Sequence, residues 1–108
     1  MSYKVGVILI NKDLILLDLD EKNIPMWNLK KGSFPIETVK RNLKNMGLEN
    51  KEIEFIEMIE KNDDKIYLYL VKDVEVLETN FTWIHKAVLL MNENYIPFSW
   101  KYMREYFE

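Results

Sequence analysis

Apolar residues are dense at the start of the chain and predict two neighbouring β-strands. Residues 3–10 form a β-branched and aliphatic run, and residues 14–20 form a second apolar-rich run after a short polar turn. Asn11 and Asp13 flank this turn, and both residue types tolerate the positive φ that a tight turn needs. The pattern therefore predicts a β-hairpin, followed by a polar loop at 20–25 and a short strand at 26–29.

From residue 35 the apolar spacing changes to steps of three and four, which is the spacing of one face of a helix. The residues on this face are Ile36, Val39, Leu43 and Met46. Pro35 suits a first helical turn, and Gly47 is the residue type that commonly follows a helix end. We therefore expect a half-buried helix over residues 36–46.

The second half of the chain carries three strand patterns and two helix patterns. The strands are expected at 52–61, 66–71 and 74–77, with a turn at 62–64; the helices are expected near 86–91, after an apolar lead at 81–84, and at 98–107. Phe55 and Ile56 are adjacent apolar residues, as are Met58 and Ile59, and this break in the alternation predicts a β-bulge. The order of elements predicts an α+β fold, a mixed β-sheet sandwich packed by short helices, with residues 1–108 as a single domain.

Composition narrows the possible functions. The chain has no cysteine, which excludes disulfides and thiolate metal sites, and its one histidine, His85, is insufficient for a typical zinc site. We interpret His85 as a cap or packing residue at a helix start. The longest apolar run, residues 5–10, is too short to span a bilayer. We expect a cytoplasmic protein with no membrane partner.

The segment from Trp27 to Gly32 resembles the Trp-x-hydrophobic-Pro-Gly-Gly signature of the Nudix hydrolases, without a gap. Residues 41–48 look like that family's Arg-Glu-hydrophobic-x-Glu-Glu-x-Gly-hydrophobic motif, one residue short. The resemblance covers nearly the whole chain, with the hairpin before the signature and the helix after it. It implies a Nudix-like fold and, in the family, Mg²⁺-dependent hydrolysis of nucleoside diphosphate derivatives.

The family's metal-binding residues are missing from these positions. Gly32 and Gly47 are fifteen positions apart, several fewer than in the family. The positions of the metal-binding glutamates carry Asn42, Lys44 and Asn45. Glu37 is the one carboxylate in the predicted helix. Because Mg²⁺ prefers anionic oxygen ligands and one carboxylate cannot build a two-metal site, we expect a degenerate site with no metal cofactor.

Basic residues concentrate in the same segment. Residues 28–51 carry a net charge of +4, whereas the whole chain carries −3. Lys30 and Lys31 lie just before the predicted helix, whose N-terminus favours anions. We therefore predict a phosphate-containing ligand, a small molecule or a nucleic acid, held by Lys30, Lys31 and Arg41, with Trp27 as an aromatic contact. The alternatives are a solvated basic face or docking to an acidic protein partner.

An active hydrolase is a second possible function. In an active hydrolase, Glu37 would act together with Glu57 or Glu60 as metal ligands or general base. Glu57 and Glu60 belong to an acidic row that also contains Glu52 and Glu54. The simpler interpretation of this row is a solvated face of the sheet, on which Glu52, Glu54 and Glu60 lie together if the strand is regular.

Aromatic residues allow a third function. A protein-interaction or inhibitor module would use the predicted C-terminal helix, which carries Trp100, Tyr102 and Tyr106. The aromatic residues outside that helix can stack on a nucleotide base or fill the core. They are Trp27, Phe34, Tyr67, Tyr69 and Trp83.

Overall fold

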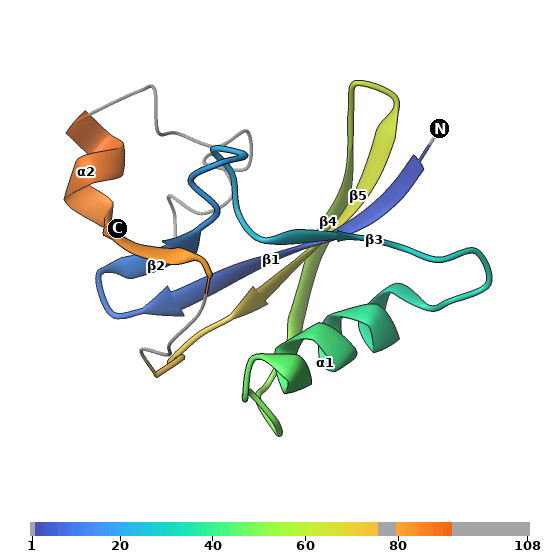
Figure 1. Ribbon diagram of the computed structural model, residues 1–108, viewed down its shortest axis with the longest axis horizontal. Coiled ribbons are helices and arrows are strands. Elements are labelled where there is room, and N and C mark those ends of the chain that lie inside the picture. Colours follow the sequence, from blue (N-terminus) through green and yellow to red (C-terminus); the bar gives the residue numbers. More distant parts are fainter. Residues whose placement is uncertain (1, 76–79, 92–108) are drawn as a thin grey trace.

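The structure is a computed structural model that describes residues 2–75 and 80–91. In these residues the chain forms a mixed sheet with helices beside it (Figure 1). The elements are β1 (Ser2–Asn11), β2 (Leu14–Leu17), β3 (Met26–Asn28), α1 (Pro35–Asn45), β4 (Glu54–Lys61), β5 (Asp64–Val71), β6 (Thr82–His85) and α2 (Lys86–Met91). Among the described helices, neither has the length and apolar character needed to cross a membrane.

Strand β1 is the centre of the sheet, whose order is β4-β5-β1-β2-β6 with β3 also paired to β1. β1 runs parallel to β5, from the pair Ser2 and Asp64 to the pair Leu9 and Val71. Its other edge is shared, because β3 pairs antiparallel with its first half and β2 with its end. The mixed sheet predicted from the sequence is confirmed.

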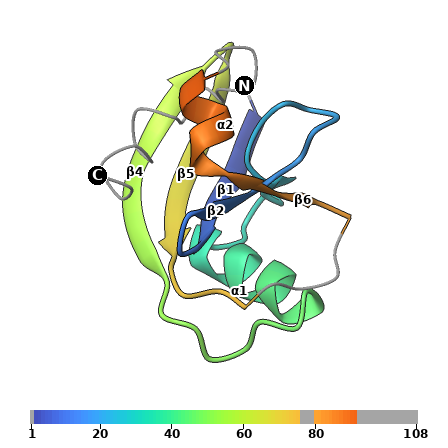
Figure 2. The same ribbon diagram turned by 90° about the vertical axis from the view of Figure 1, so that its left-hand side faces the viewer.

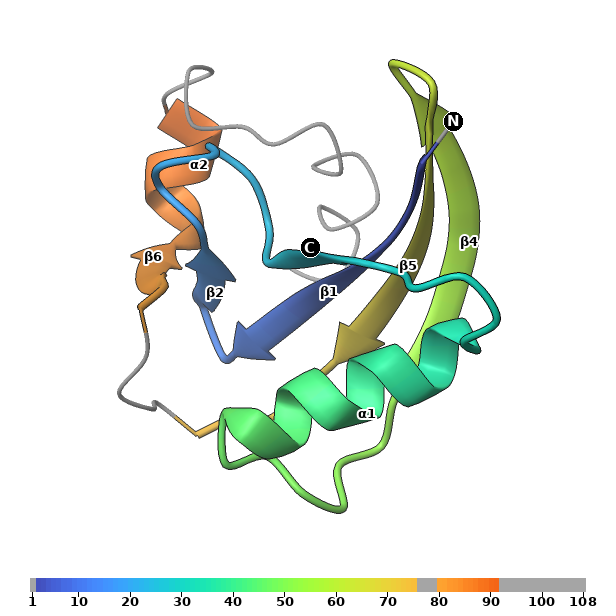
Figure 3. The same ribbon diagram turned by 45° about the vertical axis from the view of Figure 1, so that its right-hand side comes forward.

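Alternation along β1 builds two apolar cores, one on each face of the sheet. Val5, Val7 and Leu9 pack in a cluster with Val39 and Leu43 of α1. The intervening residues, such as Ile8, belong to a second cluster that includes Leu89 of α2. The two helices therefore cover different faces, and Figures 2 and 3 show α1 lying along one side of β1 and β5. The expected α+β sandwich is confirmed.

Helix α1 ends as its sequence predicts, with boundaries one residue earlier than expected at both ends. Gly47 has φ 83, in the left-handed region that glycine adopts without steric cost. The Gly47 N–H donates to the Lys44 carbonyl at 2.9 Å, and the Leu48 N–H donates to the Leu43 carbonyl at 2.8 Å. This pair of bonds is a Schellman motif, which satisfies the last carbonyls of the helix.

The first hairpin differs from its prediction in two respects. Lys12 takes the positive φ of the turn, at 53, and Asn11 is instead the last residue of β1. β2 ends at Leu17 rather than at residue 20, because Asp18 leaves the ladder and forms a two-way backbone bridge with Asn23. The Asp18 carboxylate also accepts the N–H groups of residues 20 and 21. These local hydrogen bonds make the loop begin at Asp18, earlier than the loop at 20–25 expected from the sequence.

The second half matches its prediction in most elements. The bulge is confirmed by a register shift between Phe55 and Glu57, although β4 begins at Glu54 rather than at residue 52. Residues 81–84, expected as a lead into a helix, lie largely in β6, and α2 has the expected bounds. Residues 74 and 75 are not in a strand, which corrects the predicted strand at 74–77.

Two predicted features lie outside the described residues. They are the end of the 74–77 segment and the aromatic helix at 98–107 with Trp100, Tyr102 and Tyr106.

Candidate functional site

A cavity of about 700 Å³ lies where β1 begins, where β3 ends and where α1 starts. We call it the loop cavity. It is lined by Ser2, Tyr3, Asn28, Leu29, Lys30, Lys31, Gly32, Ser33, Pro35 and Tyr67. The structure thus brings the two predicted lysines together in one hollow, next to the N-terminus of α1.

The segment between β3 and α1 is held by backbone bonds. The Leu29 N–H donates to the Tyr3 carbonyl at 2.9 Å, which ties the segment to β1. The Ser33 N–H donates to the Lys30 carbonyl at 3.0 Å, and Gly32 has φ 83 inside this turn. Phe34, the residue before α1, provides no side-chain cap. The start of α1 therefore offers its positive dipole end beside two exposed ammonium groups.

Two tyrosines, Tyr3 and Tyr67, also line the loop cavity. Tyr3 on β1 lies opposite Lys65 on β5, and Tyr67 lies opposite Val5, so both tyrosines face the same side of the sheet as α1. The Lys65 Nζ lies 5.9 Å from the centre of the Tyr3 ring. Sequence reasoning missed Tyr3, although the alternation of Tyr3 and Val5 along the strand places them on one face.

Ion pairing fixes the start of β1 at the edge of this cavity. The Ser2 hydroxyl donates to the Asp64 carboxylate, and the Lys4 Nζ lies 3.3 Å from the other Asp64 oxygen. The Ser2 hydrogen bond, followed by the Lys4 ammonium, lowers the pKa of Asp64 below its ordinary value. Asp64 is therefore engaged with β1 at neutral pH.

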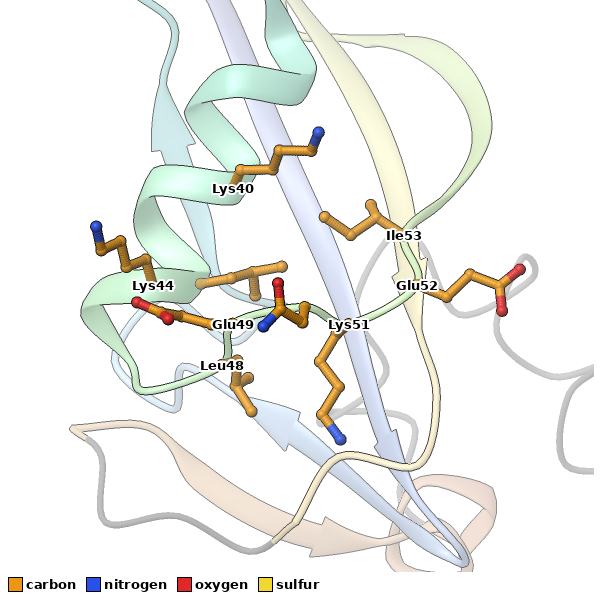
Figure 4. Close-up of a pocket in the computed structure, with 9 residues that line it drawn as sticks. Lys40, Lys44, Leu48, Glu49, Lys51, Glu52 and Ile53 are labelled. Carbon is orange, nitrogen blue, oxygen red and sulfur yellow. The ribbon is translucent and has the colours of Figure 1, made fainter.

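The remaining basic residues of the segment lie elsewhere. A second cavity, of about 650 Å³, lies between α1 and the segment that follows it, and we call it the helix cavity (Figure 4). Lys40 and Lys44 of α1 line it, as do Glu49, Lys51 and Glu52 of the following segment. The basic stretch of the sequence is thus divided between two hollows.

Arg41 and Trp27 lie apart from the two lysines. Arg41 is exposed on α1 and is not among the residues that line the loop cavity or the helix cavity. Trp27 packs partly buried against the core, with its ring edge-on to Phe81 at 6.3 Å between ring centres. It also lines a third hollow, of about 510 Å³, with Lys4 and Asp18.

The carboxylates considered for catalysis do not converge. Glu37 is exposed in the first turn of α1. The bulge in β4 corrects the expectation of a regular acidic face, because Glu54 and Glu57 pair with Leu70 and Leu68 whereas Glu60 pairs with Lys65. Side chains alternate between the two faces along β5, so Lys65 and Leu68, three residues apart, lie on opposite faces. Their partners Glu60 and Glu57 therefore lie on opposite faces as well. Glu60 is also 3.8 Å from the Lys65 Nζ.

The side chains at the expected metal positions do not form an anionic cluster. The Asn42 Nδ2 donates to the Thr38 carbonyl at 2.8 Å, and Lys44 and Asn45 are exposed. Within the described residues, no group of three or more His, Asp or Glu side chains lies close enough to hold a metal ion. This donor set does not fit Mg²⁺, which takes several anionic or carbonyl oxygens in near-octahedral geometry.

His85 has the role expected at a helix start. Its Nδ1 accepts the Ala87 N–H at 3.1 Å, where β6 passes into α2. The prediction of a capping role for this histidine is confirmed.

No protein-family model matches the sequence, and no curated protein is similar enough to be counted as a relative. Solved structures do match. A MutT structure, from work on the Aliivibrio salmonicida and Vibrio cholerae proteins, aligns with a TM-score of 0.72 and 13% identity over 98% of this chain and 95% of that one. A Nudix family hydrolase from Clostridium perfringens aligns with a TM-score of 0.60 and 18% identity over 85% of this chain and 86% of that one.

An ADP compounds hydrolase aligns with a TM-score of 0.58 and 16% identity. That match covers 86% of this chain and 63% of the hydrolase chain. At these identities the likenesses establish the fold. The chain has the fold of the Nudix hydrolases, as the resemblance in the sequence implied.

Proposed function

We propose that this chain binds a nucleoside diphosphate derivative in the loop cavity and holds its phosphates with lysines instead of a metal ion. The observation that carries the proposal is the meeting of Lys30 and Lys31 with Tyr3 and Tyr67 in one cavity of about 700 Å³. Pockets of this size accommodate small ligands of nucleotide dimensions. The lining of the cavity thus offers both cations for phosphate and aromatic rings for a base.

Electrostatics favours phosphate at the lysine end. The N-terminus of α1 contributes a partial positive charge, and Lys30 and Lys31 add two full charges at the same place. Lysine binds phosphate as a point charge, so these contacts tolerate different diphosphate geometries. Because the exposed ammonium groups are screened by salt over about 10 Å at 0.1 M, the affinity should fall as salt rises.

The test is ADP and ADP-ribose binding by calorimetry in EDTA, at low and high salt. We expect binding without a divalent metal, weakened about tenfold by Lys30→Glu/Lys31→Glu. The matched control is Lys40→Glu/Lys44→Glu, which changes the net charge equally but lies in the helix cavity. Binding that requires Mg²⁺, or that falls equally in both double variants, contradicts the proposal.

Hydrolysis is the second candidate, and the structural likeness to MutT over 98% of the chain favours it. It requires Glu37, with Glu57 or Glu60, to act in a metal site that the observed donor set does not match. We expect no turnover of nucleotide sugars, dinucleotides or oxidised nucleotides with Mg²⁺ or Mn²⁺ at enzymatic rates. Clear turnover that disappears in Glu37→Gln would instead establish a hydrolase with an unusual metal site.

A further inference from the structure

The loop cavity shares two tyrosines with an aromatic and apolar surface of the sheet, which is exposed except at the half-buried Tyr67. We call it the aromatic face and define it as Tyr3, Tyr67, Met58 and Phe55, which lie on β1, β5 and β4. Tyr3 is 43% exposed, Met58 is 39% exposed and Phe55 is 52% exposed. Large apolar side chains that gather on one surface commonly mark a binding site.

Strand register places these residues along a diagonal of the sheet, because Tyr3 pairs with Lys65, two residues before Tyr67 on β5. Met58 pairs with Tyr67, and Phe55 pairs with Tyr69, whose ring centre lies 5.3 Å from that of Phe55. Neighbouring strands lie about 4.8 Å apart, so the face extends about 10 Å from β1 across β5 to β4. Tyr3 and Tyr67 belong to both the loop cavity and the aromatic face, which makes the two continuous.

The bulge in β4 gives this face its composition. In a regular strand, Phe55 and Glu57 would lie on the same side and Met58 on the other. The register shift between Phe55 and Glu57 reverses this relation. Phe55 and Met58 now share a face, and Glu57 points to the opposite side of the sheet.

The charges beside the aromatic face are mainly positive. Lys30 and Lys31 lie at its end in the loop cavity, and Lys65 lies over Tyr3. Glu60 is the acidic residue of β4 on this side, and it is paired with Lys65. The face therefore combines stacking surfaces with a cationic end, although the chain as a whole carries −3.

We propose that the aromatic face binds single-stranded nucleic acid, with the phosphate at one end held by Lys30 and Lys31 and successive bases on the tyrosines and on Phe55. This proposal rests on the proposed function, because it extends the same phosphate site. Aromatic platforms beside cations bind single strands with little sequence preference, since every base has a face that can stack. A duplex keeps its bases stacked inside and cannot use the platform.

The experiment measures fluorescence anisotropy of a labelled oligothymidylate about six nucleotides long, with the intact chain in EDTA. We expect tighter binding of the oligomer than of thymidine diphosphate. Phe55→Ala/Met58→Ala should weaken oligomer binding about tenfold and leave thymidine diphosphate binding unchanged. The matched control is Leu19→Ala/Val88→Ala, which removes two apolar side chains of similar exposure, 41% and 42%, and should change neither affinity.

Three results overturn the inference: an oligomer that binds no tighter than thymidine diphosphate, an oligomer affinity unchanged in Phe55→Ala/Met58→Ala, and equal affinity for a duplex of the same length. Each leaves the proposed function standing if thymidine diphosphate still binds and responds to Lys30→Glu/Lys31→Glu. Loss of that response contradicts the proposed function itself. Circular dichroism of each variant confirms that the fold is kept.

Discussion

Gly47→Ala should destabilise the protein through backbone conformation alone. Gly47 has φ 83, and a Cβ added there would meet no atom of residues 2–75 and 80–91 within 4 Å. The cost is therefore the left-handed conformation itself, about 1–2 kcal/mol for a residue with a Cβ. A backbone that relaxed to avoid this cost would lose the hydrogen bonds from Gly47 to Lys44 and from Leu48 to Leu43. Each of these contributes about 0.5–1.5 kcal/mol, so relaxation gives no cheaper alternative.

The assay is urea unfolding followed by tryptophan fluorescence, with Gly47→Asn as the comparison. Asparagine tolerates the left-handed region, so Gly47→Asn should lose clearly less stability than Gly47→Ala. For a domain of this length, 1 kcal/mol corresponds to a fall in Tm of roughly 4–6 °C. Equal losses in the two variants, or no loss in Gly47→Ala, would refute the argument from φ.

Gly32→Ala tests the same conformation in a different setting. Gly32 also has φ 83, and no atom of the described part of the chain lies within 4 Å of an added Cβ, but Gly32 lies in the exposed turn of the loop cavity. An exposed turn adjusts locally at low cost, so we expect a smaller loss of stability than in Gly47→Ala. Because the turn positions Lys30 and Lys31, ADP binding should weaken in Gly32→Ala and stay unchanged in Gly47→Ala. The reverse pattern would contradict the assignment of the site to this loop.

Three further results are expected. Burial, and then the neighbouring Tyr67, raise the pKa of Tyr69 above its ordinary value of about 10. The contribution of Tyr69 to stability is therefore complete below about pH 10 and is lost as pH rises through the raised pKa. Tyr69→Phe should accordingly reduce the fall of the urea midpoint at alkaline pH. Leu43→Ala removes a fully buried side chain between α1 and the sheet and should cost about 2–5 kcal/mol in the same assay. The buried Thr38 hydroxyl has no hydrogen-bond partner among the described residues, so Thr38→Val should keep or raise the stability, and a loss above about 1 kcal/mol would contradict that description.

Local signals in the sequence predicted the local structure well. The spacing of Val39 and Leu43 and the glycine at 47 predicted α1 to within one residue, because amphipathic spacing and helix stops depend on few neighbours. The paired apolar residues at 55–56 predicted the bulge. In contrast, residue type pointed to Asn11 and Asp13 as the residues with positive φ in the first turn, and that prediction is wrong because Lys12 takes this conformation.

The site was less predictable because it depends on how distant segments meet. Lys30 and Lys31 were identified from local charge, but their partners Tyr3 and Tyr67 are brought to them by the pairing of β1 with β5. Arg41 was grouped with the lysines by sequence proximity. At about 100° per residue, however, it lies on the side of α1 away from Val39 and Leu43, which face the sheet.

The parallel pairing of β1 with β5 has a consequence for how the chain folds. Ser2 lies opposite Asp64, so β1 is synthesised sixty-two residues before the strand with which it pairs. Contacts of such long sequence separation carry a high loop-closure cost and slow folding. Until β5 emerges, the apolar run of β1 has an unpaired edge, which is the kind of segment that aggregates or is bound by chaperones. We therefore expect that fragments ending before residue 64 aggregate, and that residues 1–108 refold more slowly than a helical domain of equal length.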